Sequence, residues 1–446
     1  MLKRFIIENF SSYRDENILE LTAGRTEIHS NHFFDYSKQK VKILKSAVIY
    51  GANASGKSNL IKAIEFAKNI IINGLKEQET YKKYFRLDNK CNSLPTQFEF
   101  ELEINDKFYS YGFSVFLNKK EIVEEWLFEI GKASDELIFE RKENKVTLGK
   151  TLKKKAVKNR FEIYKEDIEK QLGQLFLAEI ANKNLEFDES EIFNKIYHWF
   201  EQKLIILHPN TQNKNFLPII NNDNISEVLK ELLKYFDTGI VDIVLFEDDF
   251  EETFKDIPKE IKINIEKDFT KEGARNTILE STRGDFFFIS KDENGELKLQ
   301  KLGLKHSKKV DELFELNDES DGTKRLFDLI PLIIQFSNDC TVLIDEFDRS
   351  LHPKLAKTFL ELFYEISSSK SQLIVTTHES TLLDLTLLRK DEIWFTEKDK
   401  TGASKLFTLN KFKERYDKKI DKAYLSGKYG AIPLFKKFSE DNLEGN

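Results

Sequence analysis

The chain has 446 residues, of which 40% are hydrophobic and 33% are charged, and its formal net charge is −7. This acidic balance excludes a protein that coats nucleic acid with its whole surface, although it is compatible with a local basic patch. The two cysteines, Cys91 and Cys340, lack disulfide or metal-ligand spacing, and the longest apolar stretch falls well short of the ~20 residues of a membrane span. We therefore expect a cytoplasmic protein without a membrane partner.

The first third of the chain predicts two kinds of sheet. Leu2–Ile7 and Ala47–Tyr50 read as strands, and the second strand runs through a glycine-containing loop into a helix over Asn59–Ile72. Alternating aromatic and polar residues from about Gln97 to Arg141 predict short antiparallel strands. A strand, a loop and a helix in this order are the context in which a phosphate-binding loop is credible.

In the rest of the chain, the sequence first predicts a mixture of helices and strands without regular order, and then a regular alternation of helix and strand. Helical periods are found at Glu189–Gln202 and Ile225–Phe236, and strand-like runs at Val241–Phe246 and Phe286–Ile289. After Glu319 the expected order is a helix, a strand (Thr341–Ile344), a helix (Pro353–Ser367) and a strand (Leu373–Thr377). This alternation predicts a parallel α/β sheet.

Residues 51–58, Gly-Ala-Asn-Ala-Ser-Gly-Lys-Ser, match the phosphate-loop pattern G-x-x-x-x-G-K-[ST]. Glycines let the backbone wrap a polyphosphate, so that successive N–H groups point at it. The Lys57 ammonium would neutralise β- and γ-phosphate charge, and the Ser58 hydroxyl would ligate Mg²⁺. We therefore predict binding of ATP and Mg²⁺ at Gly51, Asn53, Ala54, Ser55, Gly56, Lys57, Ser58 and Asn59.

Two acids end the apolar strand Thr341–Ile344. Asp345 would lie at the carboxyl edge of the sheet, where it could hold Mg²⁺ through water together with Ser58. Glu346 would follow at the position of a general base for attack on the γ-phosphate. We predict Asp345 as a metal residue and Glu346 as a catalytic residue.

Two weaker signals allow two interpretations each. Ser320 and Gly322 open a helix and offer a hydroxyl and N–H groups to an anion, but an ordinary helix N-cap fits them equally. His378 follows a strand, where it would either donate a hydrogen bond to a γ-phosphate or cap the next helix.

Together with Asp348, these elements occur in an order that resembles the ABC ATPase superfamily, in its soluble branch with RecF and the SMC proteins. The resemblance assigns Ser320 and Gly322 to the signature motif, Asp348 to the D-loop and His378 to the H-loop as a catalytic residue. It implies ATP sites completed by a second copy of the chain, in a homodimer or higher homo-oligomer. The segment Asn9–Tyr13 is similar to the Asn-Phe-x-Ser opening of such ATPases, whereas a Q-loop glutamine cannot be assigned.

A narrower resemblance rests on the phosphate loop, Pro95-Thr-Gln-Phe-Glu-Phe, Tyr109-Ser-Tyr-Gly-Phe, Glu125-Trp126-Leu and the tail Tyr424–Pro433. These motifs resemble the AAA-15/AAA-21 ATP-binding proteins related to the OLD nucleases, whose members are often encoded beside a Toprim-type nuclease in AbiL and PARIS phage-defence systems. The resemblance implies a Mg²⁺-dependent ATPase that regulates a separately encoded nuclease-like effector. Its trigger would be DNA or a phage protein.

The resemblance also implies the fold and its segments. We expect an α/β ABC-ATPase head, with a parallel phosphate-loop sheet and an antiparallel β subdomain, and an inserted mixed α/β, largely helical region. The N-terminal lobe would span 1–149, the inserted region 150–310, the C-terminal lobe 311–400 and the tail 401–446.

A RecF- or SMC-like DNA-repair ATPase that clamps DNA directly is the alternative, and a transporter subunit is a weaker one. The absence of heptads between Ser58 and Glu319 disfavours a long-armed SMC protein. Three segments could be either binding surfaces or ordinary structural elements: the basic Lys150–Arg160, the acidic Glu247–Glu252 and the tail Tyr424–Pro433.

Overall fold

A computed structural model describes the chain at residues 1–153, 158–183, 185, 188–209, 223–248, 276–280, 286–291, 297–367 and 370–433. The chain divides into two units. Unit 1 comprises residues 1–209, 336–348 and 356–446, and unit 2 comprises 210–335 and 349–355. The expected segments 1–149, 150–310, 311–400 and 401–446 do not coincide with these two units. Among the described residues, no helix is long and apolar enough to cross a membrane.

Unit 1 contains a six-stranded sheet that is parallel except at one edge. Its spatial order is β11 (Leu204–Leu207), β16 (Thr341–Ile344), β17 (Gln372–Thr376), β5 (Ser46–Gly51), β18 (Ile393–Lys398) and the antiparallel β19 (Ser404–Thr408). The carboxyl ends of the five parallel strands therefore meet at one edge, where polar residues that follow them can converge. The predicted parallel sheet is confirmed.

A seven-stranded antiparallel sheet forms the second layer of unit 1. Its spatial order is β10 (Lys145–Leu148), β9 (Glu136–Lys142), β8 (Glu121–Ile130), β7 (Lys107–Phe116), β6 (Thr96–Ile104), β1 (Leu2–Glu8) and β2 (Asn17–Glu20). A small hairpin joins β3 (Phe33–Tyr36) to β4 (Val41–Leu44). The predicted antiparallel β subdomain is confirmed, and with it the expected fold class.

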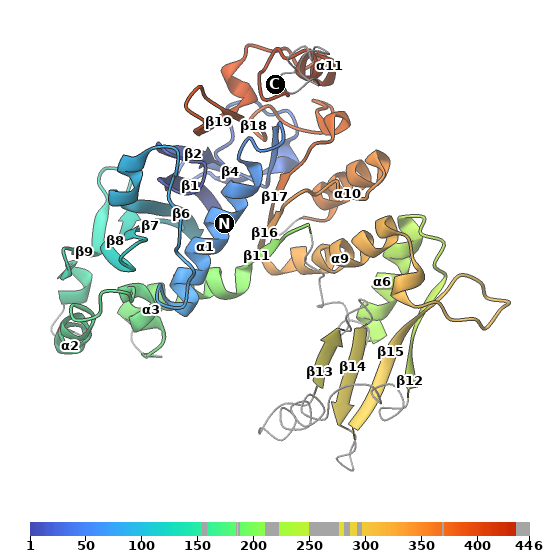
Figure 1. Ribbon diagram of the computed structural model, residues 1–446, viewed down its shortest axis with the longest axis horizontal. Helices are drawn as coiled ribbons and strands as arrows, with labels where there is room; N and C mark the ends of the chain where they lie inside the picture. The colour runs from blue at the N-terminus through green and yellow to red at the C-terminus, as the bar shows by residue number, and fades with distance from the viewer. Residues whose placement is uncertain are drawn as a thin grey trace, which may run out of the picture. The chain divides into compact units, whose positions relative to one another are not determined.

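Helices cover both faces of the six-stranded sheet. Helix α1 (Lys57–Asn73) lies on one side of it and α10 (Pro353–Ile366) on the other (Figure 1). The remaining helices of unit 1 are α2 (Lys158–Ile168), α3 (Phe176–Ala181), α4 (Glu191–His198) with a π-turn at Trp199–Lys203, and α11 (Ile420–Leu425).

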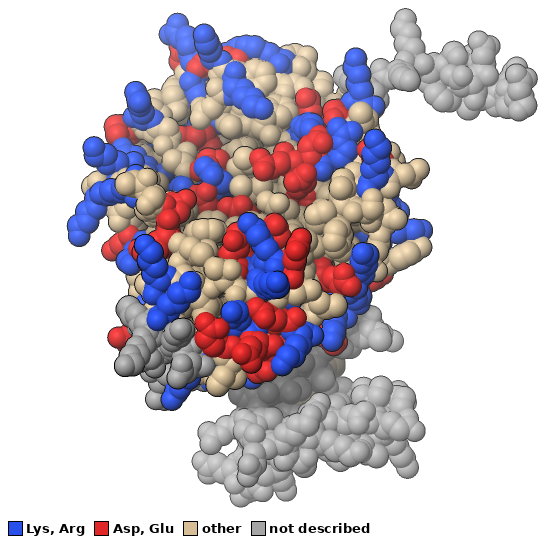
Figure 2. Space-filling model, turned by 90° about the vertical axis from the view of Figure 1, so that its left-hand side faces the viewer, with Lys and Arg blue, Asp and Glu red and all other residues tan. Residues whose placement is uncertain are grey.

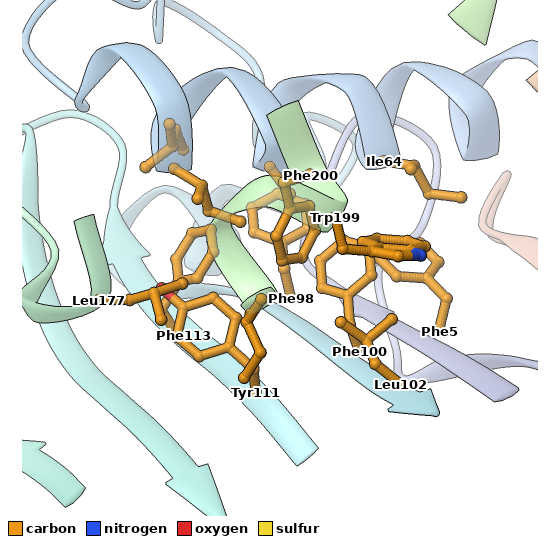
Figure 3. Packing of buried hydrophobic residues seen from close by; sticks show 14 of the residues in the cluster. Phe5, Ile64, Phe98, Phe100, Leu102, Tyr111, Phe113, Leu177, Trp199 and Phe200 are labelled. Carbon is orange, nitrogen blue, oxygen red and sulfur yellow. The ribbon is translucent and has the colours of Figure 1, made fainter. Parts of the chain in front are cut away.

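One aromatic core packs α1 against the antiparallel sheet (Figure 3). The ring of Phe100 lies 4.9 Å from that of Phe200 and 4.8 Å from that of Phe5, measured between centroids. Ile64 of α1 belongs to the same cluster and is fully buried. Because this core is close-packed, it holds α1 rigidly behind the loop that precedes it.

The motifs Tyr109-Ser-Tyr-Gly-Phe and Glu125-Trp126-Leu have structural roles on β7 and β8. Gly112 pairs with Trp126, and a Cβ at Gly112 would lie 2.4 Å from the indole, so only glycine fits beneath that ring. The fully buried Glu125 accepts hydrogen bonds from Tyr111 and from the N–H groups of Phe176 and Leu177, which tie α3 to the sheet. These residues build the subdomain.

The tail segment packs on its own chain, over β18. The rings of Tyr424 and Tyr429 stack on Phe395 at 5.6 and 5.7 Å between centroids. The N–H of Ala431 donates to Glu397 Oε2 at 3.2 Å. The tail motif thus covers the sheet face opposite α1, as part of the core.

Unit 2 combines helices with a four-stranded antiparallel sheet (Figure 1). Its elements are α6 (Asp223–Tyr235), β12 (Asp242–Asp248), β13 (Asn276–Glu280), β14 (Phe286–Lys291), β15 (Leu297–Lys305) and α9 (Asp321–Gln335). The predicted helix at 225–236 and strands at 241–246 and 286–289 are confirmed. Residues 154–157 of the basic segment and 249–252 of the acidic one lie outside the described residues.

Candidate functional site

The predicted phosphate loop lies between β5 and α1, at the carboxyl edge of the parallel sheet. Ala54 and Gly56 have φ angles of 61° and 121°, so the chain turns through left-handed backbone before the helix starts. A Cβ at Gly56 would lie 2.3 Å from Ser404 Oγ, which requires glycine there. No side chain in the described structure caps α1, so the first N–H groups of this helix are available to an anion.

Lys57 is buried within this loop, with 5% of its surface exposed. Its ammonium donates to the carbonyl oxygens of Gly51 at 2.8 Å and Ala52 at 3.3 Å. Burial lowers the pKa of Lys57 to about 8, despite the more distant charges of Asp345, Asp348 and Glu346. No carboxylate of the described residues is within ion-pair distance, so the loop holds a desolvated cation without a direct counter-ion.

The predicted metal residues are in contact. Ser58 Oγ donates to Asp345 Oδ1 at 3.0 Å, and Thr376 Oγ1 donates to the same oxygen at 2.6 Å. Asp345 is 2% exposed and its N–H donates to the Leu207 carbonyl of β11. Both hydroxyls use Oδ1, so the hydrogen bonds among the described residues leave Oδ2 to water or a cation.

The predicted catalytic residues lie along the same edge. Glu346 has a φ of 49°, and its N–H donates to Thr376 Oγ1 at 2.8 Å, so the residue after Asp345 turns out of the strand direction. The His378 N–H donates to the Asp348 carboxylate at 3.3 and 3.4 Å. Desolvation and the Lys57 ammonium lower the pKa of the His378 imidazole, although its side chain reaches the surface.

The segment Asn9–Tyr13 supports the other side of the loop. Ser12 Oγ accepts hydrogen bonds from Asn59 Nδ2 and from Ser404 Oγ, each at 2.8 Å. Tyr13 OH donates to the Gly56 carbonyl at 3.1 Å. The sequence pattern therefore indicated a true neighbour of the loop.

Sequence reasoning missed several residues that complete this edge. Thr376 bridges Asp345 and Glu346, Ser404 supports the Ser55 carbonyl, and the hydroxyls of Thr396 and Ser55 lie 2.6 Å apart. His208 follows β11, and its Nε2 lies 2.9 Å from Glu65 of α1, which raises its pKa. Only their places at or directly after the ends of parallel strands, or in the edge hairpin β18–β19, could have indicated them.

Ser320 and Gly322 belong to unit 2. Ser320 Oγ accepts the Thr323 N–H at 3.2 Å at the start of α9, as an N-cap does. A Cβ at Gly322 would lie 2.9 Å from the Ser350 carbonyl oxygen. Glu319, which precedes them, lies 2.6 Å from His306. The exposed hydroxyl of Ser320 at a helix start suits an anion site, while the capping role accounts for the same contacts.

A family model described as "AAA domain, putative AbiEii toxin, Type IV TA system" matches residues 46–384, about three quarters of the chain. An SMC head bound to the C-terminal winged-helix domain of ScpA is 13% identical, with TM-score 0.45, over 91% of this chain and 97% of that one. The SMC head of Thermotoga maritima is 14% identical, with TM-score 0.39, over 91% and 98%. An SMC head from Pyrococcus furiosus, bound to the C-terminal domain of ScpA, is 15% identical, with TM-score 0.35, over 96% and 98%. No curated protein sequence matches the chain.

Proposed function

The chain belongs to this AAA-21 family of P-loop ATPases, and we propose that unit 1 binds ATP with Mg²⁺ at residues 51–59 and hydrolyses it. The observation that carries the proposal is Lys57. Among the described residues, the buried ammonium donates only to two carbonyls, and its pKa is lowered to about 8. A triphosphate would supply the missing counter-ion and stabilise the charged form.

The residues at the sheet edge fit Mg²⁺. Hydroxyl and carboxylate oxygens are the ligands this cation prefers, and Ser58 and Asp345 present both at 3.0 Å from each other. Bound Mg²⁺ would neutralise charge on the phosphate oxygens. Thr376 would act as a positioning residue. Its hydroxyl donates a hydrogen bond to Asp345 and accepts one from the backbone N–H of Glu346.

Glu346 would act as the general base. Glu346 follows Asp345 directly, and its backbone, with a φ of 49°, turns out of the strand there. In this role it accepts a proton from the attacking water. His378, whose imidazole is kept neutral by its lowered pKa, would donate one hydrogen bond to the γ-phosphate while Asp348 holds its backbone.

Equilibrium titration with ATP tests the loop. Lys57→Ala should weaken binding by at least about 100-fold, because it removes a charge-assisted contact from a buried site. Lys62→Ala, which removes an exposed cation from the same helix, is the matched control and should leave the affinity unchanged. Equal affinities of the wild-type protein and Lys57→Ala would refute the proposed site.

We further propose that two chains complete each other's ATP sites. The signature-like start of α9 supports this, because Ser320 and Gly322 present an exposed hydroxyl and helix N–H groups. Mixing Lys57→Ala with Ser320→Arg chains should restore part of the ATPase activity, since one of the two composite sites would be intact. Two inactive variants that stay inactive at every mixing ratio would argue against shared sites.

We also propose a role in anti-phage defence, as a regulator of a separate nuclease-like effector; the resemblance of the sequence motifs supports this proposal. We expect a neighbouring gene product to co-purify with Glu346→Gln, whose ATP-bound state persists, and to be released on turnover. Recovery of DNA alone would favour the RecF-like alternative. On the face shown in Figure 2, both charge signs are interspersed among the described residues, which form no continuous basic track for DNA there.

A further inference from the structure

A cavity lies beside the phosphate loop in unit 1. Its volume is about 510 Å³, within the usual range for small-molecule sites, about 300–1,000 Å³. Ser12 and Asn59, which are hydrogen-bonded to each other, form the wall shared with the loop. Phe85 and Leu87 contribute apolar surface, and the remaining wall carries cations.

The cavity opens on the side of α1 away from the metal residues. Successive residues of a helix point about 100° apart. Ser58 therefore reaches Asp345 while Asn59 reaches Ser12, and neither Ser58 nor Asp345 lines the cavity. A triphosphate with its γ-phosphate at the Asp345–Glu346 edge would extend its nucleoside toward the Asn59 side.

Three cations line this cavity: Lys82, Arg86 and Lys398. None has an ion pair with any described residue, and the lining contains no Asp or Glu. Asp88 and Asp399 directly follow the lining residues Leu87 and Lys398, and their carboxylates accept hydrogen bonds from the backbone N–H groups of Lys90 and Thr401. Because no described carboxylate forms an ion pair with these three cations, their positive charges add at the cavity and favour an anionic ligand.

ATP alone would not require these three cations. The loop amides and Lys57 suffice for the triphosphate, and the ribose and base of ATP are neutral. Arginine binds phosphate through two parallel hydrogen bonds and lysine as a point charge, so this set suits one further phosphate.

We propose that the cavity beside Ser12 and Asn59 selects a nucleoside 5′-triphosphate that carries an additional phosphate on its ribose, bound by Lys82, Arg86 and Lys398. The inference rests on the proposed function of the loop and names the substrate class more closely. Phe85 and Leu87 provide the apolar wall for the nucleoside. The same chemistry occurs in a free 3′-phosphorylated nucleotide and at the 5′-triphosphorylated end of an RNA.

Equilibrium affinities in the full-length Glu346→Gln variant, in which the ligands survive, test the proposal. Adenosine 3′-phosphate 5′-triphosphate should bind at least about tenfold more tightly than ATP, as expected for one charge-assisted contact pair. Arg86→Gln and Lys398→Gln should reduce this ratio toward one. Lys90→Gln, an exposed neighbouring cation outside the lining, should preserve it.

A 5′-triphosphorylated adenosine dinucleotide distinguishes the two sources. Tighter binding of the dinucleotide than of the 3′-phosphorylated mononucleotide would identify an RNA end, and the reverse order a free nucleotide. Equal affinity of ATP and both extended ligands would overturn the inference while leaving the proposed ATP site intact. Failure of all three to bind would overturn both.

Discussion

Raising the pH from 7.5 to 9 should weaken ATP binding about eightfold, because Lys57 has a pKa of about 8 in the free protein. The ammonium is the form that pairs with phosphate, and about three quarters of it is present at pH 7.5 but only about a tenth at pH 9. A bound triphosphate raises the pKa again, so binding above pH 8 must take up a proton. Affinity is therefore full below this pKa and is lost as the pH rises through it.

Isothermal titration calorimetry at several pH values measures both the affinity for ATP and the number of protons taken up on binding. At pH 8, buffers of different ionisation enthalpy should reveal uptake of about half a proton per ATP. Lys57→Arg provides the control, since its guanidinium stays charged and its affinity, although lower, should not change over this range. An affinity of the wild-type protein that is constant from pH 7.5 to 9, without proton uptake, would refute the reasoning.

Three further results are expected. Glu346→Gln should bind ATP normally but hydrolyse it at least about 100-fold more slowly, since the amide cannot accept the proton; turnover at the wild-type rate would remove Glu346 from the mechanism. Thr376→Val should raise the Mg²⁺ concentration needed for half-maximal ATPase about tenfold, because Asp345 loses its positioning hydroxyl, and Thr376→Ser should restore it; an unchanged requirement would contradict that role. Gly112→Ala should lower the free energy of unfolding by about 1–3 kcal/mol in denaturant titration, because the added methyl meets the Trp126 ring; an unaltered midpoint would show that the strands relax freely.

Much of this site could be predicted from local sequence motifs. The phosphate loop is contiguous, and its strand and helix flank it directly, so the contacts of Lys57 with Gly51 and Ala52 follow from neighbours in the chain. Asp345 was predictable because an apolar strand ends there. The segment Asn9–Tyr13 was indicated by resemblance, and its contact with Asn59 bears this out.

Other residues came together only through strand order. Thr376 reaches Asp345 because β17 is inserted between β5 and β16, and no pattern within either segment encodes that insertion. Ser404 supports the loop because β19 returns antiparallel to β18 at the sheet edge. The tail motif became part of the core by stacking Tyr424 and Tyr429 on Phe395.

By itself, the sequence determined the alternation of elements, the phosphate loop and the acidic strand end, because these depend on contiguous residues and on the periods of helix and strand. The tertiary structure alone decided which hydroxyl orients Asp345 and which cations line the cavity beside the phosphate loop. Lys398 lies more than three hundred positions after Lys82 and Arg86. The three share one cavity only because the loop following α1 and strand β18 meet beside the phosphate loop. Such convergence arises from long-range packing of apolar surfaces, which has no local sequence signature.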